Sequence, residues 1–362
     1  MNIKYTNKRK WKPLIGFFFT ILLLSILFSC VEVFYNIYFP MKHEIEIIEK
    51  PSYNEDLTLE KPDLTPIQGV PYDIDSDIDP EVIMPVNEAI FKQTVIEENV
   101  LNVLVIGTDV SDNEKKIGRS DVMMLLTYNR ETKEIHLTSF LRDIWIYIPN
   151  HGWDRLNAAF AYGGTGMLIN TINENFDLDI QNYVLIDFDG LVSIVDILGG
   201  VEVQLTKAEA QLINSQTERD EDKLPESDGT YLIDGTQALI HCRNRNSASG
   251  DFDRSQRQRD IMLAMFDRVK RENSVGKLTN LLMTAAEYVK TNIKMNTIIE
   301  LGMEVITNDD LSIEQLRVPF DDTWYYASKD GRSVIVIDLV LNRDVLQNEL
   351  YFENQKYYTQ DH

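Results

Sequence analysis

Short apolar runs separated by polar turn residues fill the chain from about residue 99 onward, and they predict a series of β-strands. Each run is about four to eight residues long, and several end at a Gly, Asn or Pro. A β-hairpin is expected around Lys329-Asp330-Gly331. The expected strands are Val100–Ile106, Val122–Tyr128, Ile135–Ser139, Ile144–Ile148, Tyr183–Ile186, Val201–Leu205 and Gln315–Val318.

Longer segments with helical spacing of apolar residues lie between and after these strands. Asp234 is expected to cap one of these helices at its N-terminus. The expected helices are Gly164–Phe176, Leu191–Leu198, Thr236–Arg243, Asp253–Lys270, Lys277–Lys290, Thr297–Thr307 and a last helix from Asp338. Strands and helices in this order predict an α/β (mixed α+β) fold, with a central sheet flanked by helices.

The N-terminal segment has the pattern of a membrane anchor. Residues 14–31 carry no charge, and basic residues without any acid precede them. A spanning helix needs roughly 20 mostly apolar residues, and a basic flank stays in the cytoplasm. We therefore expect a cytoplasmic tail at 1–12 and a single-pass transmembrane anchor at 13–39. A cleaved signal peptide and lipidation at Cys30 are the alternatives, but bulky Phe28 argues against lipidation.

Composition changes sharply beyond the expected anchor. Residues 41–98 hold 15 acids and 4 bases, with no steady apolar period. We expect an extracytoplasmic, extended acidic stalk over 40–98 and one large extracytoplasmic domain over 99–362. The net charge of −23 argues against nucleic acid as a partner. The two cysteines provide no disulfide framework, and the sequence does not indicate an oligomeric state.

Arginines cluster between Cys242 and Arg259, whereas no lysine lies between Lys223 and Lys270. The clustered residues are Arg243, Arg245, Arg254, Arg257 and Arg259. Arginine without lysine in an acidic protein favours bidentate recognition of phosphate. Arg254, Arg257 and Gln258 share one helix face with the apolar Ile261 and Met265. Either this face binds a phosphate and an apolar tail, or its apolar residues are core and its arginines pair with neighbouring aspartates.

Two carboxylates are expected at one edge of the sheet. Asp109 directly follows the first strand of the domain, and Asp121 opens the second. Carboxylate oxygens suit Mg²⁺, which usually keeps several waters and binds substrate phosphates. Arg119 and Arg142 lie beside strand ends in the same region. The alternative is that each aspartate is an ordinary turn residue.

These motifs, taken in order, resemble the LytR-CpsA-Psr phosphotransferases of Gram-positive and related bacteria. The resemblance runs from about Val103 to Asp260. Its blocks are Val105–Asp109, Arg119–Asp121, Ser139–Asp143, Arg155–Ala159, Tyr162–Gly164, Asp187–Gly190, Leu198–Val201, Leu232–Leu239, Arg243–Arg245 and Asp251–Gln258. Two departures are Phe140-Leu141, where the family commonly has Ile-Pro, and His241-Cys242, where a Tyr or Val commonly precedes the paired arginines.

The resemblance implies a site and an apolar tunnel for a polyprenyl chain between sheet and helices. It implies that Asp109 and Asp121 hold Mg²⁺, with Mn²⁺ as the alternative metal. The implied catalytic residues are Asp109, Asp121, Arg142, Arg243 and Arg245. The implied pyrophosphate ligands are Arg119, Arg142, Arg243, Arg245, Arg254, Arg257 and Gln258.

The implied activity is transfer of an undecaprenyl-pyrophosphate-linked glycopolymer to a peptidoglycan hydroxyl through a phosphodiester. The domain over 99–362 would be the catalytic domain at the cell wall, and the general base would be Asp121 or Asp109. Two alternatives remain open, a pyrophosphatase on the same lipid and a non-catalytic polyprenyl-lipid-binding regulator. Teichoic acid, capsule and other secondary wall polysaccharides all fit as the polymer.

Overall fold

The computed structural model describes residues 65–66, 99–108, 118–245, 250–272, 289–294, 297–298, 300–302, 304, 308 and 311–351. The chain divides into two compact units, 1–44 and 45–362, and every described residue belongs to the second. The expected cytoplasmic tail, anchor and nearly all of the stalk lie outside the described residues. Within the described part, no helix is long and apolar enough to cross a bilayer.

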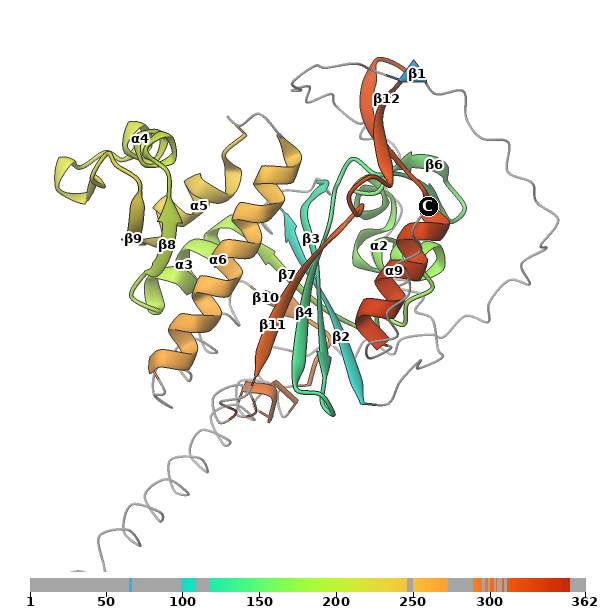
Figure 1. The fold of residues 1–362 in the computed structure, drawn as a ribbon, viewed down its shortest axis with the longest axis horizontal. Helices are drawn as coiled ribbons and strands as arrows, with labels where there is room; N and C mark the ends of the chain where they lie inside the picture. The colour runs from blue at the N-terminus through green and yellow to red at the C-terminus, as the bar shows by residue number, and fades with distance from the viewer. Residues whose placement is uncertain are drawn as a thin grey trace, which may run out of the picture. The chain divides into compact units, whose positions relative to one another are not determined.

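A six-stranded sheet forms the centre of the domain, in the order β10-β7-β2-β3-β4-β11 (Figure 1). Strands β2, β3 and β4 pair antiparallel, whereas β7 runs parallel to β2 and β11 runs parallel to β4. The sheet is therefore mixed, and its presence at the centre confirms the expected central sheet flanked by helices. Its strands are β2 Val100–Thr108, β3 Ser120–Asn129, β4 Glu134–Phe140, β7 Asn182–Asp187, β10 Val289–Thr291 and β11 Ser312–Val318.

Smaller sheets are attached to this central sheet. They are β5 Trp145–Ile148 with β6 Gly152–Arg155, β8 Val201–Leu205 with β9 Gly229–Ile233, and β12 Trp324–Lys329 with β13 Arg332–Ile337 and β1 Thr65–Pro66. Asp330 and Gly331 both have positive φ, 51° and 78°, in the tight turn between β12 and β13. This turn confirms the expected hairpin.

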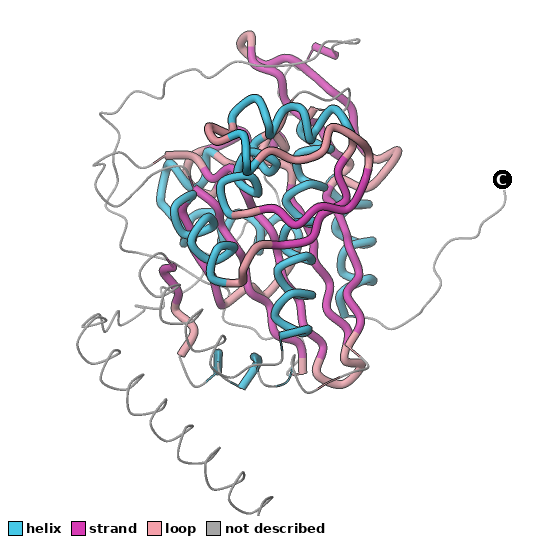
Figure 2. Tube along the Cα trace, turned by 90° about the vertical axis from the view of Figure 1, so that its left-hand side faces the viewer, coloured by secondary structure: helices cyan, strands magenta, loops and turns pink. Residues whose placement is uncertain are grey.

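Helices lie on both sides of the central sheet (Figures 1 and 2). They are α2 Ala158–Phe176, α3 Phe188–Ile197, α4 Lys207–Gln216, α5 Gly235–Arg243, α6 Asp251–Glu272 and α9 Leu339–Tyr351. Helices α2 and α9 cover one face, and α6 lies on the side of the other face together with α3 and α5. Figure 2 views the domain from the side of α4, β8 and β9.

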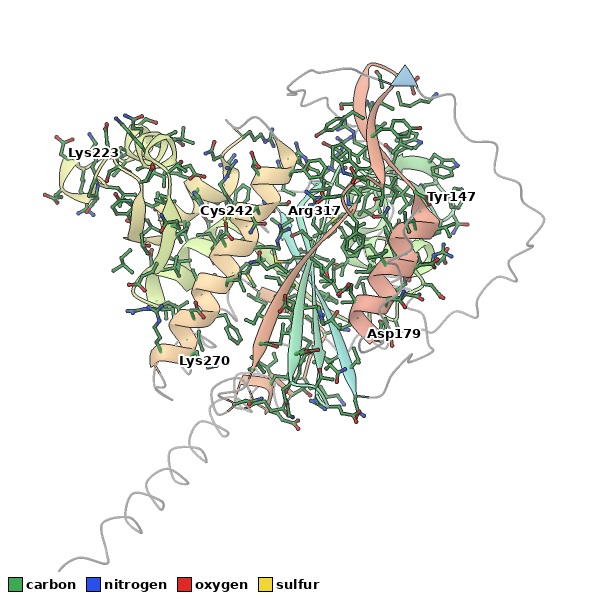
Figure 3. The ribbon with its side chains drawn as sticks, in the orientation of Figure 1. Tyr147, Asp179, Lys223, Cys242, Lys270 and Arg317 are labelled. Atoms are coloured by element: carbon green, nitrogen blue, oxygen red, sulfur yellow. The ribbon has the colours of Figure 1, made fainter. Side chains whose placement is uncertain are left out.

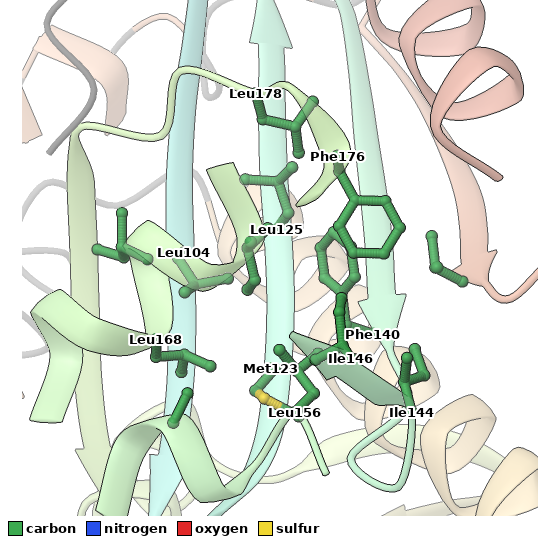
Figure 4. Close-up of a cluster of buried hydrophobic side chains, with 14 of the residues drawn as sticks. Leu104, Met123, Leu125, Phe140, Ile144, Ile146, Leu156, Leu168, Phe176 and Leu178 are labelled. Carbon is green, nitrogen blue, oxygen red and sulfur yellow. The ribbon is translucent and has the colours of Figure 1, made fainter. Parts of the chain in front are cut away.

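The larger hydrophobic core fills the space between the sheet and the α2–α9 layer (Figure 4). Alternate residues of β2 and β3, including Leu104 and Leu125, point into it. The rings of Phe140 and Phe176 pack against each other with their centres 5.2 Å apart. A separate core joins α3, α4, α5 and α6 to β8 and β9. The α2–α9 layer therefore packs on one face of the central sheet, and a helical lobe with its own core lies on the side of the other face.

Most predicted elements are confirmed, with ends that shift by a few residues. Helix α2 begins at Ala158 rather than Gly164, because non-helical backbone at Gly163 and Gly164 divides it into two helical pieces. Asp234 caps α5 as expected and accepts from the Gln237 amide at 2.8 Å. The expected helix over 277–290 lies mostly outside the described residues, and its last two positions belong to strand β10 instead.

Candidate active site at the sheet edge

Charged side chains converge where β2 and β4 end and β3 begins. Asp121 is the second residue of β3, and Arg142 follows the end of β4. Thr108 pairs with Ser120 across β2 and β3, so the residues that precede Asp109 and Asp121 lie opposite each other. Asp109 itself lies outside the described residues. Antiparallel pairing thus brings these sequence motifs to one edge of the sheet.

Arg142 is at the centre of the cluster and contacts three carboxylates. Its Nη1 lies 2.8 Å from Asp121 Oδ1, and its Nε lies 3.3 Å from Asp251 Oδ1 and 3.7 Å from Asp143 Oδ2. Burial alone would lower the pKa of Arg142, but these carboxylates outweigh burial and raise it. The guanidinium group is therefore a permanent cation.

Two more arginines extend the charged network. The Nη2 of Arg254 lies 2.5 Å from Asp251 Oδ1, and the Arg254 side chain is only 5% exposed. Arg155 Nη1 lies 3.1 Å from Asp143 Oδ1, and its Nη2 donates to the Ser333 carbonyl at 2.6 Å. These residues come from β3, the β4–β5 connection, β6, the start of α6 and β13. The cluster therefore forms only when these segments, which lie far apart in the sequence, fold together.

The pKa values of Asp121 and Asp143 are shifted in opposite directions. Burial would raise the pKa of Asp121, but Arg142, Arg254 and Arg245 together bring it below its usual value. Burial and the nearby Asp251 raise the pKa of Asp143, against the opposing effect of its arginine partners. Asp121 therefore stays a carboxylate at neutral pH, as a ligand for a hard divalent cation must.

No cluster of three or more His, Cys, Asp or Glu suited to a metal occurs among the described residues, which do not include Asp109. Asp121 supplies one ionised carboxylate with a side chain that is 26% exposed. One or two carboxylates plus water and substrate oxygens are the usual protein ligands of Mg²⁺. The described part of the site therefore fits a magnesium ion whose coordination shell is completed by water and substrate oxygens.

A second basic group lies beside this cluster. Burial and the positive charge of Arg155 lower the pKa of Arg119, and Arg332 acts in the same direction. Asp154 opposes them and accepts a hydrogen bond of 2.5 Å from Tyr162. Arg119, which the sequence singled out, therefore lies near Arg155 and Arg332, which the sequence reasoning did not.

Arg243 and Gln258 are less directly connected to the cluster. The guanidinium carbon of Arg243 lies 4.8 Å from the centre of the Phe188 ring at the start of α3. This is a cation–π contact, which orients the side chain against α3. Gln258 is half-buried on α6. The roles of Arg243 and Gln258 in binding phosphate stay predictions from the family resemblance.

Arg257 has protein partners on two other helices. Its Nη2 donates to the Asn244 carbonyl at 2.8 Å, and its Nη1 lies 3.3 Å from Glu209 Oε1. Asn244 stands between Arg243 and Arg245, at the end of α5. The buried Arg257 therefore supports the segment that carries those two arginines, and this geometry favours a supporting role over direct contact with a ligand.

The apolar face of α6 beyond the arginines is core. Ile261 is 1% exposed, and Met265 packs against the same helical core. The alternative in which these residues are core and Arg254 pairs with Asp251 therefore describes this helix better than an apolar binding face. A different apolar surface lies on the sheet. Val105, Leu126, Val184 and Ile186 are half-buried, and in the described part of the chain they belong to neither hydrophobic core.

Sequence reasoning missed several members of the cluster. Asp143, Arg155 and Asp251 all stand inside the family-like blocks, so the blocks contained a signal that was not assigned a role. Arg332 follows the hairpin turn, far from every block, and only the fold brings it near Arg119.

Comparison with known proteins gives this arrangement its context. The LytR_cpsA_psr family profile matches residues 80–339. Biofilm regulatory protein A of Streptococcus mutans is 32% identical over 217 residues, which are 57% of this chain and 53% of that protein. TagT of Bacillus subtilis, a polyisoprenyl-teichoic acid–peptidoglycan teichoic acid transferase, is 30% identical over 204 residues, 55% of this chain and 62% of TagT. The chain thus spans between half and two thirds of these relatives.

A solved structure shares the fold. TagT with bound octaprenyl pyrophosphate lipid superposes with a TM-score of 0.55 at 26% identity, over 72% of this chain and 93% of that one. The family profile covers well over half of the chain and includes every described element of the candidate site. The chain belongs to the LytR_cpsA_psr family.

Proposed function

We propose that this protein transfers a polyprenyl-pyrophosphate-linked glycopolymer to peptidoglycan and leaves the two joined by a phosphodiester. The observation that carries the proposal is the convergence of Arg142 and Arg254 on Asp121 and Asp251 at one sheet edge. Family membership, the transferase activity in the name of TagT and the octaprenyl pyrophosphate bound to its structure support the proposal.

The arginines would bind the pyrophosphate through their planar forks. The charges of Arg142, Arg254 and Arg245 act on Asp121 and lower its pKa, and Arg119 lies in the neighbouring basic group. The non-bridging oxygens of an incoming pyrophosphate can accept paired hydrogen bonds from these guanidinium groups. Arg257 would keep Arg243 and Arg245 in place through the Asn244 carbonyl.

The reaction needs positioning and charge neutralisation more than covalent chemistry from the protein. An acceptor sugar hydroxyl attacks the glycan-side phosphorus, and the new P–O bond forms as the bond to the bridging oxygen breaks. The electron pair of that bond leaves on polyprenyl phosphate. The hydroxyl proton passes to a base, for which we propose whichever of Asp121 and Asp109 is not fully engaged by the metal ion, and Arg142 stabilises the developing negative charge.

Asp121, together with Asp109, would hold Mg²⁺, with Mn²⁺ as the alternative. When bound, the metal ion would supply neutralisation of charge on the phosphate oxygens. The pairing of Thr108 with Ser120 supports this placement, because each residue directly precedes one of the two aspartates.

The polyprenyl chain would lie in an apolar tunnel over the sheet face opposite the α2–α9 layer. Val105, Leu126, Val184 and Ile186 supply apolar area there that neither core uses. Burying such area against an isoprenoid chain is favourable by roughly 25 cal/mol per Å². In the proposed donor this chain is undecaprenyl. The N-terminal anchor proposed at 13–39 would hold the domain at the extracytoplasmic surface of the cell membrane, where the pyrophosphate end of that lipid lies.

A transfer assay tests the proposal. The full chain in detergent is incubated with Mg²⁺, purified peptidoglycan and a lipid-linked polymer whose glycan is labelled. The expected result is label attached to peptidoglycan through an acid-labile phosphodiester. Release of the label as free glycan phosphate would identify a pyrophosphatase instead. Tight binding of the lipid with neither product would identify a non-catalytic lipid binder.

A further inference from the structure

A row of aromatic side chains connects the start of α6 to the hairpin formed by β12 and β13. The centres of the Phe252 and Trp324 rings lie 4.4 Å apart, and those of Trp324 and Tyr326 lie 5.0 Å apart. The Arg317 guanidinium carbon lies 4.4 Å from the centre of the Phe252 ring, at the inner end of the row. The row is therefore anchored at Phe252 and extends outward to Tyr326.

Exposure increases along the row. Phe252 is 8% exposed, Trp324 is half-buried and Tyr326 is 37% exposed. Trp324 and Tyr326 alternate with Tyr325 along β12, so they point to one face of the strand and Tyr325 to the other. The outer ring is thus held by packing on one side and remains accessible on the other.

The hairpin is joined to the charged cluster at several points. Ile335, which pairs with Tyr326 across the hairpin, donates its amide to the Asp143 carbonyl at 2.8 Å. Phe252 directly follows Asp251, which contacts Arg142. Burial raises the pKa of Tyr326, and the charges of Asp251 and Asp143 raise it further. The aromatic row therefore borders the site proposed for the pyrophosphate.

We propose that Trp324 and Tyr326 form a stacking surface for a pyranose ring directly beside the phosphate site. The inference rests on the proposed function and deepens it. A pyranose ring presents apolar C–H faces and a rim of hydroxyls, and tyrosine and tryptophan combine an apolar ring with a polar edge. In the proposed transfer, the reacting phosphorus lies between the first sugar of the donor and the acceptor sugar. The occupant is therefore the first sugar of the donor or the sugar of the acceptor.

A polyprenyl chain fits this surface less well than a sugar does. The row borders the charged cluster through Ile335 and Phe252, and the charges of Asp143 and Asp251 act on Tyr326, so burying hydrocarbon there would also remove charged groups from water. The half-buried apolar residues of the sheet face, with Val105 among them, provide a surface without such charges. The aromatic row, which borders charged groups, therefore suits a sugar, and the apolar sheet face suits the lipid.

Binding measurements with two ligands test the inference. The full chain in detergent is titrated with undecaprenyl pyrophosphate and with undecaprenyl pyrophosphate that carries a disaccharide. If the surface binds the donor, Tyr326→Ala should weaken binding of the sugar-bearing lipid about tenfold and change binding of the sugar-free lipid less than about twofold. Tyr326→Phe keeps the ring and should bind the sugar-bearing lipid almost as the parent does.

Tyr325→Ala is the matched control, because it removes a neighbouring exposed tyrosine from the opposite face of the same strand. It should leave both affinities unchanged. If the surface binds the acceptor, Tyr326→Ala should instead raise KM for peptidoglycan about tenfold, with both lipid affinities and kcat preserved.

Three results would overturn the inference while leaving the proposed function intact. The first is that Tyr326→Ala changes neither the affinity for the sugar-bearing lipid nor KM for peptidoglycan. The others are equal losses of affinity in Tyr325→Ala and Tyr326→Ala, and equal losses of affinity for the sugar-bearing and the sugar-free lipid in Tyr326→Ala. Failure of the parent protein to bind sugar-free undecaprenyl pyrophosphate would count against the proposed function itself. A thermal melt of each variant confirms that the hairpin is folded.

Discussion

Arg142 lies among three aspartates, and this arrangement decides what the residue contributes. A buried arginine with several carboxylate partners keeps its charge and its orientation before any ligand arrives. Preorganised charge of this kind lowers a barrier because no reorganisation is needed when the negative charge develops. The aspartates around Arg142 are thus part of the proposed catalytic arrangement even where they touch no substrate.

Arg142→Lys should lower the rate of polymer transfer by at least about 100-fold with little change in stability. Lysine keeps the positive charge, but it cannot place two parallel donors on a phosphate. The measurement is the initial rate of label transfer to peptidoglycan together with a thermal melt. Arg219→Lys is the control, because Arg219 forms ion pairs with Glu221 and Asp222 with its side chain 71% exposed. A rate for Arg142→Lys within about threefold of the parent rate would contradict the assigned role.

His241 should make the domain less stable in mild acid. Burial lowers its pKa to about 4, whereas Glu209 opposes and Arg257 reinforces this effect. An unfolded histidine titrates near pH 6.5, so between pH 6.5 and 4 the unfolded chain binds more protons than the folded chain. The contribution of His241 to the unfolding free energy is therefore full above pH 6.5 and is lost as pH falls toward 4. The loss is about 2 kcal/mol between pH 7 and 5.

Urea unfolding at pH 7 and pH 5 measures this dependence. His241→Gln should reduce the difference in unfolding free energy between the two pH values. The control is Cys242→Ala on the same helix, since burial raises the pKa of that thiol to about 12 and it does not titrate in this range. An equal pH dependence in the parent and in His241→Gln would show that other groups cause the acid sensitivity.

At the scale of elements, the sequence predicts strands and helices well where one apolar face dominates. The sequence predicts both Val100–Ile106 and Val201–Leu205 as strands, because the first is a β-branched-rich apolar run that stops at Gly107 and the second alternates apolar and polar residues. Helix α4 was missed because Lys207–Gln216 is mostly polar, and its stability comes from the capping box of Thr206 with Glu209 and from packing of a few residues.

The candidate site shows the same division. The sequence placed Asp121, Arg142 and Arg254 together through strand ends and family-like blocks, and the structure does bring them together. It did not show that Arg257 reaches Asn244, because that contact depends on how α5 packs against α6. The sequence also did not predict that Tyr326 lies near Asp143, because the pairing of β13 with the β4–β5 connection has no local signal in the sequence.

Gly235 is required for the close packing of α5 against α3. A methyl group at this position would lie 2.7 Å from the Val192 Cα atom and would also collide with the Val192 carbonyl. Gly235→Ala should therefore cost about 2–3 kcal/mol of unfolding free energy and displace α5, which begins at Gly235 and carries Arg243 at its other end. Chemical denaturation checks the energy, and the transfer rate checks the displacement.

Gly229→Ala is the comparison for Gly235→Ala. A methyl group there would meet only the far end of the Tyr231 side chain, at 3.1 Å, and that side chain can move aside. Its cost should stay within about 1 kcal/mol. Equal costs at the two glycines would mean that α3 and α5 separate easily, contrary to their close packing in the structure.

At the scale of the whole molecule, the last helix is fixed to the first strand of the domain. Asn102 on β2 donates to Asp179 at 2.6 Å and to the Tyr351 hydroxyl at 2.7 Å, and the Tyr351 hydroxyl donates to Asp179 at 2.8 Å. Figure 3 shows Asp179 at the end of α9. This buried network joins β2, the α2–β7 connection and α9 behind the larger core.

Tyr351→Phe should lower the unfolding free energy by about 1–3 kcal/mol, because Asp179 and Asn102 then lose a buried partner. The change should leave the transfer rate of the folded protein near the parent value, since the network lies away from the charged cluster. Denaturation curves and initial rates measure the two quantities. Tyr325→Phe removes an exposed hydroxyl and should change neither. A large loss of rate without loss of stability would contradict this separation.

The bond between Asn102 and Tyr351 spans 249 positions of the chain. A ribosome makes Asn102 early and Tyr351 late, and β11, which covers one edge of β4, is also made late. A nascent chain therefore carries an open strand edge and an unsatisfied amide until its final helix has been synthesised. A product that stops before α9 should be recognised and degraded by proteases, so a premature stop near the C-terminus would remove this protein as completely as one near its start.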